Sequence, residues 1–167
     1  PADLTSDFIV THFFNPPRFM RLLEVVKSPT FDAARFESFC HFADITLGKG
    51  VVPAKDTPGF LANRIGVYWM TCGLLDAIAL NVPVEAADAV MGKPLGIPKT
   101  GLFGLYDLIG IDLMPLIAQE MLSTLPQQDA FRQLYNLPDL VKKMIADGYT
   151  GRKGKGGFYR LVTDEKG

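Results

Sequence analysis

The chain contains little cysteine and no excess of either charge, and both shortages narrow the classes of protein it can belong to. Its 167 residues include two cysteines, and 17 basic residues are balanced by 18 acidic ones. Cys40 and Cys72 lack the paired spacing of metal ligands, so we expect free thiols in apolar helices and a reducing compartment. The balanced charge gives no indication of a nucleic-acid partner.

Long apolar runs and common cofactor motifs are also missing. Asp76 interrupts the longest apolar stretch, Ile65 to Leu80, so we expect no insertion into a membrane. No Gly-x-Gly-x-x-Gly follows a predicted strand, and no zinc spacing or serine nucleophile elbow is present. We therefore expect no metal site and no complete dinucleotide site. No signal peptide is visible, and because the chain begins at Pro1 we expect a piece of a longer protein.

The residues that are present predict a mainly helical domain preceded by two strands. Residues 8–14 and 21–27 are rich in β-branched and aromatic residues and are separated by Asn15-Pro16-Pro17, which is typical of two strands joined by a turn. After Pro29 the apolar spacing becomes helical. The helices are expected over 31–47, 58–80, 84–91, 100–110, 112–125 and 138–147.

The strongest candidate for chemistry is one histidine and one glutamate in the two predicted strands. A turn about residues 17–18 brings His12 and Glu24 roughly opposite each other, within reach of a hydrogen bond. A carboxylate that orients a histidine leaves the other ring nitrogen free to act as a general base. The alternative, which the residues alone leave open, is a histidine with a purely structural hydrogen bond.

Other polar residues are weaker candidates. Asn63 lies in the apolar 58–80 segment, where its amide either bonds a substrate oxygen or links two structural elements. Asp56 and Thr57 are expected to cap that helix, and Asp107 and Asp112 to cap the helices around Gly110. His41 is expected to be structural or at the surface. The basic glycine-rich segment 151–157 is either a surface loop or a contact for a phosphorylated ligand.

Taken in order, these motifs resemble the L-3-hydroxyacyl-CoA dehydrogenases, including the dehydrogenase part of multifunctional fatty-oxidation enzymes. The shared residues are His12-Phe13-Phe14-Asn15-Pro16, Glu24, Asp56-Thr57-Pro58-Gly59-Phe60 with Asn63-Arg64, and Gly151-Arg152-Lys153 with Gly156-Gly157-Phe158-Tyr159. The resemblance covers nearly the whole chain. It implies the fold of a helical domain like the C-terminal domain of 6-phosphogluconate dehydrogenase, preceded by two strands left from a Rossmann sheet.

The resemblance also implies roles for particular residues. His12 is the catalytic base, Glu24 is its partner, Asn15 lies beside the nicotinamide of NAD and Asn63 hydrogen-bonds the substrate. Residues 1–28 are then the end of the NAD-binding domain, and residues 29–167 form a helical domain for acyl-CoA binding and homodimer formation. Most of the NAD site is expected before Pro1, so the chain alone is expected to be nearly inactive. The location is cytoplasmic in a bacterium, and otherwise mitochondrial or peroxisomal.

Two alternative functions stay open at this point. One is a related dehydrogenase of another β-hydroxy acid, although such relatives commonly use a lysine base where this chain has His12. The other is a non-catalytic helical dimerisation module in which the pair of His12 and Glu24 is only structural.

Overall fold

The computed structural model describes residues 5–97 and 99–160, which are mostly helical with one small three-stranded sheet. This confirms the predicted fold class. The chain divides into two compact units, Pro1–Arg64 and Ile65–Gly167. The predicted division into residues 1–28 and 29–167 stays a prediction. In the structure, the segment after residue 28 contributes a helix and a third strand to the first unit.

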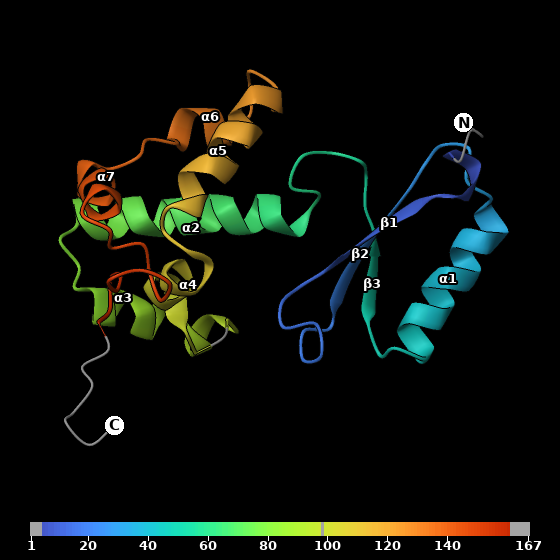
Figure 1. Cartoon of the computed structure of the whole chain (residues 1–167), viewed down its shortest axis with the longest axis horizontal. Coiled ribbons are helices and arrows are strands. Elements are labelled where there is room, and N and C mark those ends of the chain that lie inside the picture. Colours follow the sequence, from blue (N-terminus) through green and yellow to red (C-terminus); the bar gives the residue numbers. More distant parts are fainter. Residues whose placement is uncertain (1–4, 98, 161–167) are drawn as a thin grey trace. The chain divides into compact units, whose positions relative to one another are not determined.

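The first unit is built around a central strand, β2 (Figure 1). Strand β2 pairs antiparallel with β1 and parallel with β3. The predicted turn joins β1 to β2, and the register places His12 opposite Glu24, as expected. The elements in order are the 3-10 helix η1 (Thr5–Asp7), β1 (Ile9–Phe13), β2 (Leu22–Lys27), α1 (Ala33–Ile45) and β3 (Gly50–Pro53).

Helix α1 provides the crossover that a parallel pair of strands requires. The side chain of Asp32 caps this helix by accepting a hydrogen bond from the backbone N–H of Arg35 at 2.8 Å. Apolar side chains of β2, of α1 and of the segment between them form one buried cluster, which consists of Leu23, Val25, Phe31, Phe36 and Ala43. Burial of these side chains holds β2 as the interior strand of the sheet.

Helix α2 (Ala62–Ala79) begins four residues later than the predicted position 58. Gly59 and Phe60 have φ angles of 72° and 46°, in the left-handed region, which an α-helix cannot include. The expected caps, Asp56 and Thr57, therefore lie before the helix and not at its first turn. The helix starts only after these two residues have redirected the chain.

The second unit is a set of helices around one apolar cluster. Its elements are the remainder of α2, then α3 (Val84–Val90), the 3-10 helix η2 (Lys93–Leu95), α4 (Gly101–Ile109), α5 (Leu113–Thr124), α6 (Ala130–Leu134) and α7 (Asp139–Ala146). Helix α2 contributes Val67, Met70, Leu74 and Ala77 to the buried cluster. The same helix also has exposed apolar side chains, such as Ile65 at 62% and Ile78 at 40%, so it is buried on one side only.

Within the described residues, no single helix is both long and apolar enough to cross a bilayer. Helices α4 and α5 together have the length and apolar composition of a span, but the chain bends by 89° between them.

Candidate active site

The two residues singled out from the sequence meet across the β1–β2 ladder. Nδ1 of His12 lies 2.7 Å from Oε2 of Glu24. The side chain of Glu24 is 1% exposed, whereas that of His12 is 28% exposed. The carboxylate is therefore held in the interior, and the imidazole reaches from it toward solvent.

The second oxygen of Glu24 binds the start of helix α2. Oε1 accepts hydrogen bonds from the backbone N–H groups of Leu61, at 2.9 Å, and Ala62, at 2.8 Å. A helix N-terminus leaves such donors without partners inside the helix and favours negative charge. Glu24, 37 residues earlier in the chain than Leu61, thus does the work of the cap that had been expected from Asp56 or Thr57.

These contacts decide the ionisation of the carboxyl group. Burial, the largest single influence, raises the pKa of Glu24. The hydrogen bonds from His12 and from the N–H groups of Ala62 and Leu61 lower it, and together they leave the pKa of Glu24 below its ordinary value. Glu24 is therefore an anion near neutral pH.

The charge of Glu24 fixes the tautomer of the neutral histidine. An ionised carboxylate can only accept hydrogen bonds, so Nδ1 of His12 carries the proton that is shared with Oε2. Nε2 of the neutral ring then has a free lone pair and can take a proton from a substrate. The arrangement supports a general base that is oriented through its other nitrogen.

Two aromatic rings border the imidazole. The ring centroid of Phe14 lies 4.6 Å from that of His12, and that of Phe60 lies 5.5 Å away. Phe60 holds this place with a left-handed backbone that is uncommon for a bulky residue. The two rings therefore pack beside the imidazole.

The structure places the other two predicted site residues at the surface near the ends of elements. Asn15 follows β1 and is exposed, in a cis peptide bond with Pro16. Asn63 is the second residue of α2 and is also exposed. Asn63 thus lies within the predicted helical segment, but in the first turn of α2 and not in its apolar interior. Its neighbour Ala62 is bound to Glu24, which ties the position of Asn63 to the same carboxylate.

The basic glycine-rich segment does not form an anion cradle. Most backbone N–H groups of the segment donate to main-chain carbonyls of the protein and not to a ligand. The donors are the N–H groups of Gly151, Arg152, Gly154, Lys155 and Gly157. Asp107, which is 5% exposed, accepts hydrogen bonds from the N–H groups of Phe158 and Tyr159, each at 2.9 Å. Asp107 therefore anchors this segment and does not cap a helix as predicted. The role of the segment in this structure is to attach the end of the chain to α4.

The remaining candidates add nothing to the site. His41 is exposed on α1. Cys40 and Cys72 are half-buried free thiols. Asp112 precedes α5 but makes no cap hydrogen bond and pairs with Lys153 at 2.9 Å. In residues 5–97 and 99–160, no group of three histidine, cysteine or acidic side chains could hold a metal ion.

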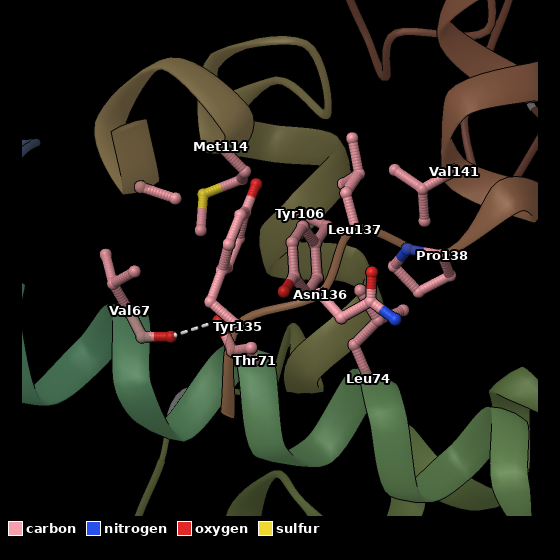
Figure 2. Close-up of a pocket in the computed structure, with 11 residues that line it drawn as sticks. Val67, Thr71, Leu74, Tyr106, Met114, Tyr135, Asn136, Leu137, Pro138 and Val141 are labelled. Atoms are coloured by element: carbon pink, nitrogen blue, oxygen red, sulfur yellow. Dashed lines mark hydrogen bonds between the residues drawn. The ribbon is translucent and has the colours of Figure 1, made fainter. Parts of the chain in front are cut away.

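A cavity in the second unit is too small to be a substrate site. It has a volume of about 20 Å³ and lies among side chains of α2, α4 and α5 and the segment that follows α6 (Figure 2). A space of this size holds about one water molecule, whereas ligand pockets enclose roughly 300 Å³ or more. Burial raises the pKa of Tyr106 in its wall above the ordinary range. The cavity is a packing defect of the helical core.

Two family models match the chain along most of its length. Residues 2–57 match the model of "3-hydroxyacyl-CoA dehydrogenase, NAD binding domain". Residues 59–161 match the model of "3-hydroxyacyl-CoA dehydrogenase, C-terminal domain". The change from one model to the other falls immediately before the start of α2 and after the three-stranded sheet.

Individual relatives agree with these matches. A putative fatty acid oxidation complex trifunctional enzyme of Rickettsia prowazekii is 43% identical over 96% of this chain, which spans 22% of that protein. A probable 3-hydroxyacyl-CoA dehydrogenase of Deinococcus radiodurans is 37% identical over 98% of this chain, which spans 46% of it. The crystal structure of (S)-3-hydroxybutyryl-CoA dehydrogenase PaaH1 from Ralstonia eutropha has a TM-score of 0.76 and 28% identity, over 93% of this chain and 53% of that one. The chain thus spans about a fifth to a half of these relatives, and it belongs to the 3-hydroxyacyl-CoA dehydrogenase family.

Proposed function

We propose that the chain carries the catalytic base of an NAD-dependent (S)-3-hydroxyacyl-CoA dehydrogenase. The reaction oxidises a 3-hydroxyacyl-CoA to the 3-oxoacyl-CoA in the β-oxidation of fatty acids. The observation that supports this best is the 2.7 Å contact between His12 Nδ1 and a buried Glu24 that is held by two backbone N–H groups. The family matches supply the class of substrate.

In this proposal His12 removes the proton from the 3-hydroxyl group of the substrate through Nε2. The ring becomes a cation as it takes the proton, and the adjacent carboxylate of Glu24 stabilises that charge. A correctly placed base of this kind typically accelerates a reaction by about 10²–10⁴-fold. Asn63, at the first turn of the helix bound to Glu24, donates a hydrogen bond to the same substrate oxygen.

The exposed amide of Asn15 suits the nicotinamide end of NAD, because an amide offers both a donor and an acceptor to the carboxamide of the ring. When bound, NAD would supply the acceptor for the hydride that leaves C3 of the substrate. The 167 residues contain no glycine fingerprint for the pyrophosphate. We therefore propose that the polypeptide alone turns over slowly and needs the larger part of an NAD-binding domain.

The proposal is tested in a fusion that supplies this part. In the fusion, the chain replaces the corresponding 164 residues of the Deinococcus radiodurans relative, and oxidation of NADH is measured with acetoacetyl-CoA. We expect His12→Gln to lower kcat by about 10²–10⁴-fold with little change in thermal stability. His41→Gln, an exposed histidine on α1, is the matched control and retains the rate.

The outcomes separate the candidate functions. Equal rates for the fusion and its His12→Gln variant refute the proposed base. A His12→Gln variant that keeps its rate but loses stability favours the non-catalytic module. Turnover of other β-hydroxy acids in preference to the acyl-CoA favours the related dehydrogenases. Rapid turnover by the 167-residue chain itself contradicts the need for a further NAD-binding part.

We also propose that the chain forms a homodimer through its second unit. Helices α2, α4 and α5 carry exposed apolar side chains that include Ile65 at 62%, Leu108 at 52% and Leu116 at 61%. Exposed apolar surface of this kind is common at interfaces between proteins.

The cellular location is also a proposal: the cytoplasm in a bacterium, and mitochondria or peroxisomes otherwise.

A further inference from the structure

One buried lysine binds the loop that connects the two strands of the candidate site. Lys49 immediately precedes β3 and is 8% exposed. Its Nζ donates hydrogen bonds to the main-chain carbonyls of Pro17 and Met20, the latter at 2.8 Å. Both carbonyls belong to the loop that joins β1, which carries His12, to β2, which carries Glu24.

The contacts of Lys49 differ from those of an ordinary buried lysine. A buried charge is costly unless it is paired, and buried lysines usually lie against a carboxylate. Among the residues that the structure describes, no carboxylate forms an ion pair with Lys49, and its ammonium group donates to the two carbonyls. Its Nζ also lies 5.8 Å from the centre of the Phe13 ring. The ammonium group therefore donates hydrogen bonds only to the loop between β1 and β2 among the residues described.

The loop that Lys49 holds has few other restraints. The N–H groups of Phe19 and Met20 both donate to the carbonyl of Pro16 at 3.0 Å, which forms a local turn. Phe19 itself is 74% exposed and buries little apolar surface. Lys49 connects this turn to the edge of β3, from a position 29 residues beyond Met20. Without the lysine, the loop depends on its internal turn and on the ends of the two strands.

We propose that Lys49 is a positioning residue that fixes the loop from Asn15 to Met20 beside His12. The lysine does not contact the imidazole and acts through the backbone of the loop. Its catalytic consequence rests on the proposed function, in which Asn15 lies against the nicotinamide. Loosening the loop then weakens the use of NADH, while the pair of His12 and Glu24, held by the β1–β2 ladder and by α2, keeps its geometry.

The first experiment uses the 167-residue chain and needs no activity. In the wild-type protein, we expect NMR to resolve a slowly exchanging Lys49 ammonium with couplings across its hydrogen bonds to the carbonyl carbons of Pro17 and Met20. Hydrogen exchange of the Phe19 and Met20 amides is then compared among Lys49→Met, Lys49→Arg and Lys55→Met. We expect about tenfold faster exchange in Lys49→Met, and wild-type exchange in Lys55→Met, which changes an exposed lysine after β3.

Three outcomes of this experiment overturn the proposal. They are the absence of the ammonium couplings in the wild-type protein, unchanged loop exchange in a folded Lys49→Met variant, and equally increased exchange in Lys55→Met. The NMR measurement on the wild-type chain decides the matter even where Lys49→Met fails to fold. Recovery of slow loop exchange in Lys49→Arg, which keeps the charge and the donors, supports it.

The second experiment measures the catalytic consequence in the fusion described above. We expect Lys49→Met to raise KM for NADH about tenfold with a smaller change in kcat, and Lys49→Arg to recover most of the loss. An unchanged KM for NADH, with faster loop exchange, refutes the positioning role. The proposed function fails separately, through equal rates of the parent fusion and its His12→Gln variant, and that result leaves the measurements on the isolated chain unaffected.

Discussion

Glu24 stands directly opposite His12 in the β1–β2 ladder, and its Oε2 lies 2.7 Å from the Nδ1 of that histidine. The same side chain accepts two N–H groups at the start of α2 through Oε1. Substitutions of Glu24 therefore remove the hydrogen bond to His12, the hydrogen bonds to the start of α2, or both. This makes Glu24 the most informative single residue for testing the candidate site.

Glu24→Gln is expected to inactivate the fusion while leaving it folded. The amide oxygen of glutamine can still accept from Leu61 and Ala62, but its NH₂ group then faces Nδ1 of His12. Nδ1 must become an acceptor, so the proton moves to Nε2, which can no longer act as a base. We expect kcat for oxidation of (S)-3-hydroxybutyryl-CoA by NAD, the direction in which Nε2 acts as the base, to fall by about 10²–10⁴-fold. Glu37→Gln, at an exposed position on α1, is the control, and similar rates for the two variants contradict the assignment.

The ionised form of Glu24 should also stabilise the fold in a defined pH interval. The folded protein lowers the pKa of Glu24 below its ordinary value near 4.5, so between these two values the unfolded chain binds more protons. The free energy of unfolding therefore rises with pH across the interval. The contribution is complete above about pH 4.5 and is lost as the pH falls through the folded-state pKa. Urea unfolding of the 167-residue chain at a series of acidic pH values should show this slope, and Glu24→Gln should reduce it.

The hydrogen bonds between Asp107 and the segment after Gly157 should make a large contribution to stability. Asp107→Ala leaves the N–H groups of Phe158 and Tyr159 without their acceptor. We expect the free energy of unfolding to fall by about 2–4 kcal/mol. Asp139→Asn, which removes only an exposed ion pair with Lys142, should lower the free energy of unfolding by less than about 1 kcal/mol. Equal midpoints for Asp107→Ala and the wild type would show that the segment is not anchored there.

A pair of glycine substitutions tests the close contact between Gly157 and Asp107. A Cβ on Gly157 would lie 1.9 Å from Oδ1 of Asp107, so Gly157→Ala must displace the carboxylate or the chain. We expect a loss of about 1–3 kcal/mol in the free energy of unfolding. Gly66→Ala, within α2, meets nothing within 4 Å and should gain about 0.5–1 kcal/mol from helix propensity. Opposite signs for the two variants are the result that the structure requires.

Self-association can be tested with two substitutions on one helix. Leu116→Lys places a charge at an exposed apolar position of α5, whereas Glu120→Lys changes a neighbouring exposed polar position. We expect light scattering to show a dimer for the wild type and for Glu120→Lys, and a shift toward monomer for Leu116→Lys. A wild-type protein that stays monomeric at high concentration rules out the proposed homodimer.

Local patterns were sufficient to predict much of the fold and the central pair of the site. A turn about residues 17–18 predicted that His12 lies opposite Glu24, and the observed register confirms this pairing. The helical spacing predicted α1, α3, α4, α5 and α7 to within a few residues. The short helix α6 was missed, although its cap, Asp129, accepts from the N–H of Phe131 and could have been recognised.

The remaining features depend on contacts between distant residues. Strand β3 was not among the predicted strands, because its parallel partner β2 lies across a helical crossover. The start of α2 was misplaced because its capping carboxylate comes from Glu24 and not from the preceding residues. Lys49 was overlooked because nothing near it in the sequence shows that it binds two carbonyls of another loop. The spacing of residues in the sequence does not predict such contacts between distant segments.

The division of labour between the two oxygens of Glu24 restricts what can replace it. One oxygen serves the imidazole and the other serves the amides at the beginning of α2. Aspartate has the same charge, but its shorter stem withdraws the carboxylate by about 1.5 Å. An aspartate side chain can therefore bind either the imidazole or the backbone amides, and the hydrogen bonds to the other are lost. Reach, as much as acidity, therefore sets the chemical identity of this position.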